Sequence, residues 1–450
     1  MNFELIKNAI AEELSALGII EYEIYYMSNL ETSVGTLNKE INAFTSGIRA
    51  GLCLRVVYDG KLGYASTELM DVEEMKELAL RALENAKHTE KPDKVGIFKG
   101  SDAYEDSRIP EYRPLSADEL KTAAKSVGEN IFTYSDKVRD GSSSQTVSAG
   151  FDIRIVNSHG LNLSTSCGVN VGISEAVVAE GEEFQSAFAL EELNPSDIDG
   201  SVKVLVSKAV DEAISKIGAG LVPSGKYNIV FDGKQMRSLL SVFSSVFSAR
   251  MVLDGISMLK GKVGEEIAAP IVTITDDPQR EGSSIGTTFD AEGVATKRRA
   301  VVDGGVLKTY LHNRETALEM GVESTANASK GDYSSPVSIM PHSFAIEPGD
   351  KSFEELLALA GDGILITELK GLHAGANPIT GDFSLESAGF MIKGGKVCEA
   401  VKSFTVAGNF LSLLKSISAI GDKLELGVAT SFTGFGSPAV LVPDMSVAGK

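Results

Sequence analysis

Residues 49–67 read RAGLCLRVVYDGKLGYAST, and they predict a β-hairpin. Apolar and polar residues alternate on both sides of Asp59-Gly60, a dipeptide that favours the tight turn between two antiparallel strands. Upstream, the short runs EYEIYYM (residues 21–27) and TSVGTLNKEINAFTSG (residues 32–47) alternate in the same way. We therefore expect the N-terminal part of the chain to form a twisted antiparallel sheet.

Amphipathic helices are expected on both sides of these strands in the sequence. Residues 3–17 carry apolar side chains at the i, i+3, i+4, i+7 spacing of a helix, so the N-terminus resembles a domain helix more than a signal peptide. Residues 71–87 show the same periodicity, and Asp71 is a suitable N-cap. Residues 92–114 are polar and contain several prolines, which indicates a connecting loop.

A second helix is predicted over residues 116–132, and it is followed by alternating runs with a turn at residues 157–160. Another helix is predicted over residues 195–217. The order of helix, strands and helix thus recurs. This recurrence suggests an internal duplication, although the two copies share no obvious residue identity.

Turn-forming residues are concentrated in GAGLVPSGKY (residues 218–227), which predicts a domain boundary. We expect an N-terminal domain of helices and antiparallel sheet over residues 1–222 and a C-terminal β-rich domain over residues 223–450. The connections in the second domain are too short for many parallel crossovers. The fold class is therefore α+β, with a strand-rich, mixed, β-barrel-like C-terminal domain.

The C-terminal domain contains the apolar runs GFMI (residues 389–392) and AVLV (residues 439–442). Exposed apolar strands require a cover. We therefore expect this domain to supply most of a subunit interface.

The charge of the chain excludes several partners. Sixty-two acidic and 42 basic residues give a net charge of -20. This charge repels nucleic-acid phosphates and anionic membrane surfaces, so we expect neither DNA nor membrane binding and favour small or peptide substrates. No apolar stretch is long enough to span a bilayer. Cys53, Cys167 and Cys398 lie far apart in the sequence, which favours a reducing compartment and therefore the cytoplasm.

The common zinc-peptidase motif is absent from the sequence. That motif needs two histidines four residues apart on one helix face and a glutamate after the first. None of the five histidines is followed by glutamate, and no two lie within ten residues of each other. Each is expected to be a surface or turn residue, with no metal site in this chain. Residues 282–286 match the G-x-S-x-G motif, but they are not flanked by the preceding strand and following helix that a nucleophile elbow joins.

The segment GLHAGANPITGDFS (residues 371–384) is too rich in glycine and turn formers for a helix or strand. Glycine lets another chain approach the backbone closely, and short polar side chains beside it offer hydrogen bonds. We therefore predict a peptide-binding role for His373, Gly375, Asn377, Thr380, Gly381 and Asp382. The alternative is a structural loop held by its own hydrogen bonds, and the sequence does not separate the two.

Three blocks of the sequence resemble the PmbA/TldD family, which is also called modulator of DNA gyrase. They are SGIRAGLCLRVVYDGKLGYAST (residues 46–67), FDAEGVATKRRAVVDGGVLKTYLHNRETALEMGVEST (residues 289–325) and GLHAGANPITGDFSLESAGFMIKGGKVCEAVKSFTVAGNFLSLLKSISAIGDKLEL (residues 371–426). The similarity extends over nearly the whole chain, and its motifs occur in few other proteins.

The TldD type of this family carries a His-Glu-x-x-x-His zinc motif on the helix that opens the C-terminal domain, and a cysteine near the C-terminus. The corresponding helix here is MRSLLSVFSSVFSARM (residues 236–251), where residues 241–246 take the place of the motif. Residues 424–442 contain no cysteine. The chain therefore resembles the PmbA type, also called TldE, which lacks both features.

The resemblance implies a two-domain subunit whose dimer encloses a chamber, where a zinc-bearing TldD-type partner cuts small or unfolded peptides. This chain would contribute part of the chamber and no zinc. Two alternatives remain open at this point. One is a self-sufficient peptidase with a disguised metal or serine site, and the other is a homodimeric peptide-binding protein without catalysis.

Overall fold

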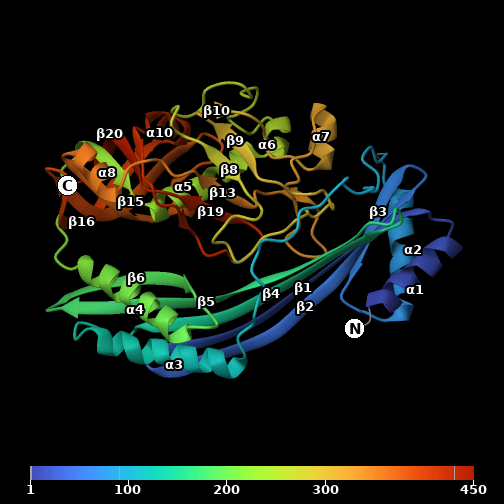
Figure 1. Cartoon of the computed structure of the whole chain (residues 1–450), viewed down its shortest axis with the longest axis horizontal. Coiled ribbons are helices and arrows are strands. Elements are labelled where there is room, and N and C mark those ends of the chain that lie inside the picture. Colours follow the sequence, from blue (N-terminus) through green and yellow to red (C-terminus); the bar gives the residue numbers. More distant parts are fainter. Residues whose placement is uncertain (1–2, 91, 430) are drawn as a thin grey trace.

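The structure is a computed structural model that describes residues 3–90, 92–429 and 431–450. A long curved sheet occupies the N-terminal part, and a strand-rich body formed by the C-terminal part packs along it (Figure 1). None of the described helices is both long and apolar enough to cross a lipid bilayer. The α+β class predicted from the sequence is confirmed.

The curved sheet has six antiparallel strands in the order β3-β2-β1-β4-β5-β6. Their bounds are β1 Glu21–Leu37, β2 Glu40–Tyr58, β3 Lys61–Thr67, β4 Ser143–Asn157, β5 Asn162–Glu180 and β6 Glu183–Glu192. The short runs expected here are in fact continuous long strands, because β1 and β2 pair from Glu21↔Val57 to Leu37↔Glu40 with one irregularity, at Gly35/Thr36.

The predicted hairpin is confirmed, since β2 and β3 are joined by Asp59 and Gly60 alone. Both turn residues have positive φ, 50° and 68°, as a two-residue turn between right-twisted strands requires. The apolar side chains of β2 alternate accordingly. Leu52, Leu54 and Val56 are fully buried against the helices, so the residues between them face the opposite side of the sheet.

Helices cover both ends of the outer face of the curved sheet (Figure 1). They are α1 (Phe3–Ala16) with α2 (Val72–His88) at one end, and α3 (Ala117–Tyr134) with α4 (Ile198–Ser215) at the other. Asp71 caps α2, as predicted, and Ser116 begins α3 with a capping box. The order of helix, three strands and helix thus occurs twice, as α1-β1-β2-β3-α2 and as α3-β4-β5-β6-α4. The two units meet where β1 pairs with β4, which is the arrangement that the suggested duplication requires.

Five strands of the C-terminal part close into a barrel, because β16 pairs with both β15 and β20. They are β7 Gly225–Phe231, β14 Gly363–Lys370, β15 Asp382–Lys393, β16 Lys396–Asn409 and β20 Val440–Ala448. Only β7 and β14 run parallel. The mixed, barrel-like C-terminal part expected from the sequence is therefore confirmed, while the boundary between residues 222 and 223 stays a prediction.

A second six-stranded sheet, in the order β10-β9-β8-β13-β19-β18, packs beside the barrel. Its strands are β8 Ile274–Asp276, β9 Arg299–Asp303, β10 Val306–Leu307, β13 Ser343–Ile346, β18 Glu425–Leu426 and β19 Gly434–Ser437. Helix α5 (Gly233–Phe243) belongs to the core shared by this sheet and the barrel. Its last residue, Phe243, stacks on Phe410 at the start of α10 (Phe410–Ser416), with 4.6 Å between ring centroids.

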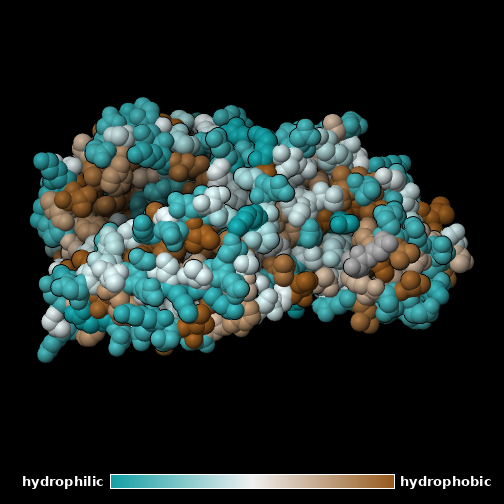
Figure 2. All heavy atoms as spheres, turned by 60° about the horizontal axis from the view of Figure 1, so that its bottom comes forward, coloured by the Kyte–Doolittle hydropathy of each residue, from teal (hydrophilic) through white to brown (hydrophobic). Residues whose placement is uncertain are grey.

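The apolar runs that were expected to need a partner are covered within the chain. Val440 and Val442 are buried in the barrel core, while Leu441 and Ile392 pack with helix α8 (Phe353–Ala360). The reason for placing a subunit interface there was therefore wrong. On the face shown in Figure 2, hydrophilic side chains cover most of the surface and apolar residues form separate small patches.

Candidate functional site

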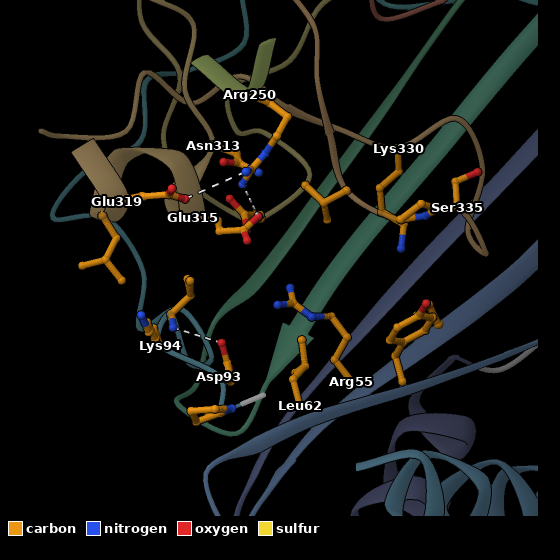
Figure 3. Close-up of a pocket in the computed structure, with 18 residues that line it drawn as sticks. Arg55, Leu62, Asp93, Lys94, Arg250, Asn313, Glu315, Glu319, Lys330 and Ser335 are labelled. Carbon is orange, nitrogen blue, oxygen red and sulfur yellow. Dashed lines mark hydrogen bonds and ion pairs between the residues drawn. The ribbon is translucent and has the colours of Figure 1, made fainter. Parts of the chain in front are cut away.

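A cavity of about 1190 Å³ lies where the β2–β3 end of the curved sheet faces the C-terminal part (Figure 3). Strands β2 and β3 and the connecting loop at residues 92–95 form one side. Helices α6 (Ala249–Leu253) and α7 (Arg314–Met320) and residues 330–337, which we call the Lys330 loop, form the other. Its volume is large enough for a short peptide.

Strand alternation places charge on the cavity wall. Cys53 and Arg55 lie on the face of β2 opposite the helix-covered residues, and both line the cavity. The Arg55 guanidinium donates to Oε1 of Glu23 on the neighbouring strand at 3.0 Å. Glu23 is only 1% exposed, so this pair is a buried ion pair that contributes stability only while both partners remain.

Glu292 lines the adjacent part of the wall, and Arg314 bonds to it. A carboxylate oxygen of Glu292 accepts the backbone N–H of Arg314 at 2.8 Å, and burial raises the pKa of Glu292. The Arg314 guanidinium donates to the carbonyls of Val95 and Gly96 at 2.7 and 2.9 Å. Arg314 thereby holds the connecting loop against the C-terminal part.

Asp290 lies behind this wall and is 2% exposed. Its carboxylate accepts three backbone N–H groups, from Glu292 at 2.9 Å, Val294 at 3.0 Å and Ala328 at 3.0 Å. Burial and the charge of Glu292 raise the pKa of Asp290 to about 8. These bonds connect Asp290 to the start of β11 (Ala328–Ser329), the strand that leads into the Lys330 loop.

The opposite rim carries an exposed charge network. The Arg250 guanidinium lies 3.0 Å from a carboxylate oxygen of Glu315 and within 4 Å of Asp254 and Glu319. Exposed pairs of this kind each contribute little to stability. They do give the rim a fixed arrangement of charges facing the cavity (Figure 3).

The cavity continues along α5. A space of about 530 Å³ shares Arg250, Asn313, Glu315 and Val337 with it and extends to Ser241, Val242 and the 3₁₀ turn Ser244–Phe247. A further space of about 920 Å³ shares Ser241 and Val242 and reaches the β6 side of the curved sheet. The open face of α5 and its 3₁₀ turn thus presents serines and Val242, together with the cationic side chains of Lys234 and Arg237 at its start.

The residues on this face do not fit a zinc ion. Serine hydroxyls and valine are not the imidazole, thiolate or carboxylate ligands that zinc binds. Within residues 3–90, 92–429 and 431–450, no three His, Cys, Asp or Glu side chains are grouped so that they could hold a metal. We derive no metal-dependent step for this chain.

One prediction about the histidines was wrong. His312 was expected at the surface or in a turn, yet it is 2% exposed, and its Nδ1 lies 3.3 Å from the Thr316 hydroxyl. Burial, with a smaller effect of the Arg299 charge, lowers the pKa of His312 to about 4. His312 is therefore a neutral structural residue at neutral pH.

None of the six predicted peptide-binding residues lines the cavity. They lie around α9 (Leu372–Gly375) and the start of β15, where only the neighbouring Leu372 borders the 920 Å³ space. The polar groups of this segment bond mostly to one another. The Asn377 side chain accepts from the backbone of Ile379 at 2.9 Å, and Asn409 donates to the Thr380 carbonyl and the Asp382 carboxylate, both at 3.0 Å. His373 is exposed, and no hydrogen bond or ion pair joins it to the described residues.

The two glycines that were assigned a binding role, Gly375 and Gly381, are required by the backbone. A Cβ on Gly375 would lie 2.5 Å from the Ser384 carbonyl oxygen. Gly381 has φ +82°, and a Cβ there would lie 2.7 Å from the Met258 methyl group. Both observations suit the structural alternative, and the peptide-binding role stays a prediction.

Sequence reasoning missed the cavity residues Arg55, Glu292 and Lys330, and also Arg314, which bonds to Glu292. A signal existed at Arg55, which is the one charged residue in the apolar run LCLRVVY. Glu292 and Lys330 lie in irregular segments that periodicity cannot place, and Arg314 begins the short helix α7. Only the fold brings them together with β2.

Comparisons with known proteins agree with this architecture. The model of the PmbA/TldA metallopeptidase C-terminal domain matches residues 224–449, and that of PmbA/TldA metallopeptidase domain 1 matches residues 22–86. A metalloprotease of Methanothermobacter thermautotrophicus is 28% identical over 439 residues, covering 94% of this chain and 93% of its own length. Metalloprotease PmbA of Escherichia coli O157:H7 is 24% identical over 430 residues, covering 93% of this chain and 90% of its own.

Two solved structures share the whole fold. A Thermotoga maritima protein named as a modulator of a DNA gyrase is 30% identical with a TM-score of 0.89, covering 99% of this chain and 100% of that one. TldE from Thermococcus kodakarensis is 24% identical with a TM-score of 0.87 and the same coverage, which shows a common fold.

Proposed function

The chain belongs to the PmbA/TldD metallopeptidase family, and we propose that it is the TldE-like subunit of a TldD/TldE-type peptidase complex. In this proposal its cavity forms part of a chamber for small or unfolded peptides. A TldD-type partner supplies the zinc ion and the catalytic residues. The complex acts in the cytoplasm, without contact with nucleic acid or membrane.

The observation that carries the proposal is the open face of α5. This face borders the cavities, and α5 corresponds to the helix that carries the zinc motif in the TldD type. It presents Ser241, Val242, Ser244 and Ser245 in place of ligands. A cavity large enough for peptides, joined to a helix face without catalytic groups, suits a subunit that holds substrate for its partner.

A homodimeric peptide-binding protein is the second candidate, because the same cavity would hold a peptide without any partner. The two candidates predict different assemblies. The affinity-tagged chain should be co-expressed with an untagged TldD-type subunit from the same genome, and the purified material analysed by light scattering. A 1:1 complex supports the peptidase subunit, whereas a homodimer that excludes the TldD-type chain supports the second candidate.

Peptide hydrolysis by the complex and by each subunit alone provides a second test of the proposal. The complex should hydrolyse a short unstructured peptide, and each subunit alone should not. A variant of the TldD-type partner without its zinc-binding histidines should still form the complex and lose hydrolysis. Hydrolysis by the present chain alone would instead support a self-sufficient peptidase.

A further inference from the structure

Lys330 presents an unpaired ammonium group to the cavity. It lies directly after β11 and lines the cavity wall, where its side chain points toward the β2 side (Figure 3). Its Nζ lies 4.8 Å from the centroid of the Tyr25 ring. No carboxylate or hydrogen-bond acceptor of the described residues contacts this ammonium group, and burial lowers the pKa of Lys330.

The Lys330 loop holds this group in place. The Tyr333 ring lies against Gly51 of β2 so closely that a Cβ on Gly51 would be 2.5 Å from it. The Asp332 carboxylate accepts the backbone N–H groups of Ser334 and Ser335 at 2.8 and 2.7 Å, which closes the turn. The ammonium group is therefore positioned before any ligand arrives, which lowers the entropic cost of binding.

The neighbouring acids are engaged with other donors or lie too far from Lys330 to pair with it. Glu23 is paired with Arg55 through Oε1 while its buried Oε2 has no hydrogen-bond partner, Glu292 accepts from the backbone of Arg314, and Asp290 accepts three backbone N–H groups. No ion pair within 4 Å joins Lys330 to any of them or to Asp332 in the described part of the chain. Lys330 is thus a cation of this cavity with no carboxylate in direct contact.

A half-buried ammonium group without an acceptor is costly unless a ligand supplies one. The complementary ligand is an anion, and carboxylates are the anions that every unmodified peptide carries at its C-terminus. We propose that Lys330 binds the free C-terminal carboxylate of a short peptide in this cavity. The inference rests on the proposed peptide-chamber function and narrows its substrates to peptides that end inside the cavity.

Binding to the chain alone tests this inference. Calorimetric titration at pH 7 should compare acetyl-tetraalanine acid with acetyl-tetraalanine amide, which differ only at the C-terminus. We expect the acid to bind about tenfold more tightly. Equal affinities, or no binding of either peptide, would overturn the inference.

Variants assign the preference to Lys330. Lys330→Met should abolish the preference for the acid, and Lys330→Arg should retain it because a guanidinium also binds carboxylates. Lys94→Met is the matched control, since Lys94 lines the same cavity from an exposed position and its removal should leave the preference intact. If Lys330→Met and Lys330→Arg both keep the wild-type preference for the acid over the amide, Lys330 does not bind the carboxylate.

A third peptide separates the two sources of a carboxylate. Acetyl-Ala-Ala-Ala-Glu-amide carries the charge on a side chain and should bind no better than the neutral amide. If it binds as tightly as the acid, the site recognises acidic side chains, and the proposal that Lys330 binds the C-terminal carboxylate is wrong. Because these titrations need no partner, their failure is distinct from a failure to form the peptidase complex.

Discussion

The hydroxyl group of Tyr333 donates a hydrogen bond of 2.6 Å to Oε1 of Glu68, which lies directly after β3. These residues are 265 positions apart. The bond connects the Lys330 loop of the C-terminal part to the curved sheet. Burial, and then the hydrogen bond to Glu68, raise the pKa of Tyr333 to about 12, so the phenol remains a donor across the physiological range.

Replacing Gly51 should disturb this contact. In Gly51→Val the new Cβ would lie 2.5 Å from the Tyr333 ring, so the ring must move. We expect a loss of about 1–3 kcal/mol in the free energy of unfolding and weaker peptide binding, measured by denaturant titration and calorimetry. Gly47→Val is the matched control on the same strand, because nothing lies within 4 Å of its Cβ position. Equal stability of the two variants would show that the Tyr333 contact is unimportant.

Lys330 and Arg55 should respond in opposite ways to the loss of their charge. Lys330→Met removes a half-buried cation that has no carboxylate within 4 Å. Its contact with the Tyr25 ring is weaker than the desolvation cost that the substitution relieves, so the melting temperature should stay the same or rise. Arg55→Met leaves Glu23 buried and unpaired, which should cost about 3–5 kcal/mol. Thermal unfolding of both variants measures the difference. If Lys330→Met destabilises as strongly as Arg55→Met, Lys330 has a structural role instead.

His312 should make stability depend on pH. Its folded pKa, about 4, lies below the ordinary histidine value of 6.5, so the folded state favours the neutral ring. Its contribution is therefore complete above pH 6.5 and is lost as the pH falls toward 4, by about 3 kcal/mol in total. Urea titrations at several pH values across this range give the free energy of unfolding as a function of pH. This free energy should fall less steeply with decreasing pH in His312→Gln than in wild type, whereas the exposed His159→Gln should behave like wild type. An unchanged slope in His312→Gln would refute this assignment.

The predicted peptide-binding segment is best tested at His373. Gly381→Val would strain a backbone with positive φ and cost about 1–3 kcal/mol, so a loss of activity there would not identify a binding role. His373→Ala changes an exposed side chain and should leave the melting temperature unchanged. Reduced peptide hydrolysis by the assembled complex would then support the binding role. Full activity would favour the structural alternative.

Most elements of the fold could be predicted from the sequence because local signals determined them. The Asp59-Gly60 turn and the Asp71 cap depend on a few adjacent residues, and both are confirmed. The length of β1 and β2 could not be predicted. Their middle segments are continuous because the two strands pair with each other along their whole length. The apolar and polar residues stop alternating in these segments, so the sequence pattern does not show that the strands continue.

The cavity could not be predicted for a related reason. Arg55 and Lys330 lie 275 residues apart in the sequence, and they line the same cavity because the Lys330 loop packs on β2. The reason for expecting a subunit interface at GFMI and AVLV was wrong on the same ground, because the sequence does not show which segment packs on which. An apolar run shows that a strand is covered, but the sequence does not say whether the cover is another subunit or helix α8 of the same chain.

In the proposed complex this chain contributes a peptide chamber and its partner contributes the zinc. Elemental analysis of zinc in the purified chain, and in its complex with a TldD-type subunit, decides whether this division holds. We expect far less than one zinc per molecule for the chain alone and one zinc per heterodimer for the active complex. One equivalent of zinc bound by the chain alone, together with peptide hydrolysis, would contradict the account.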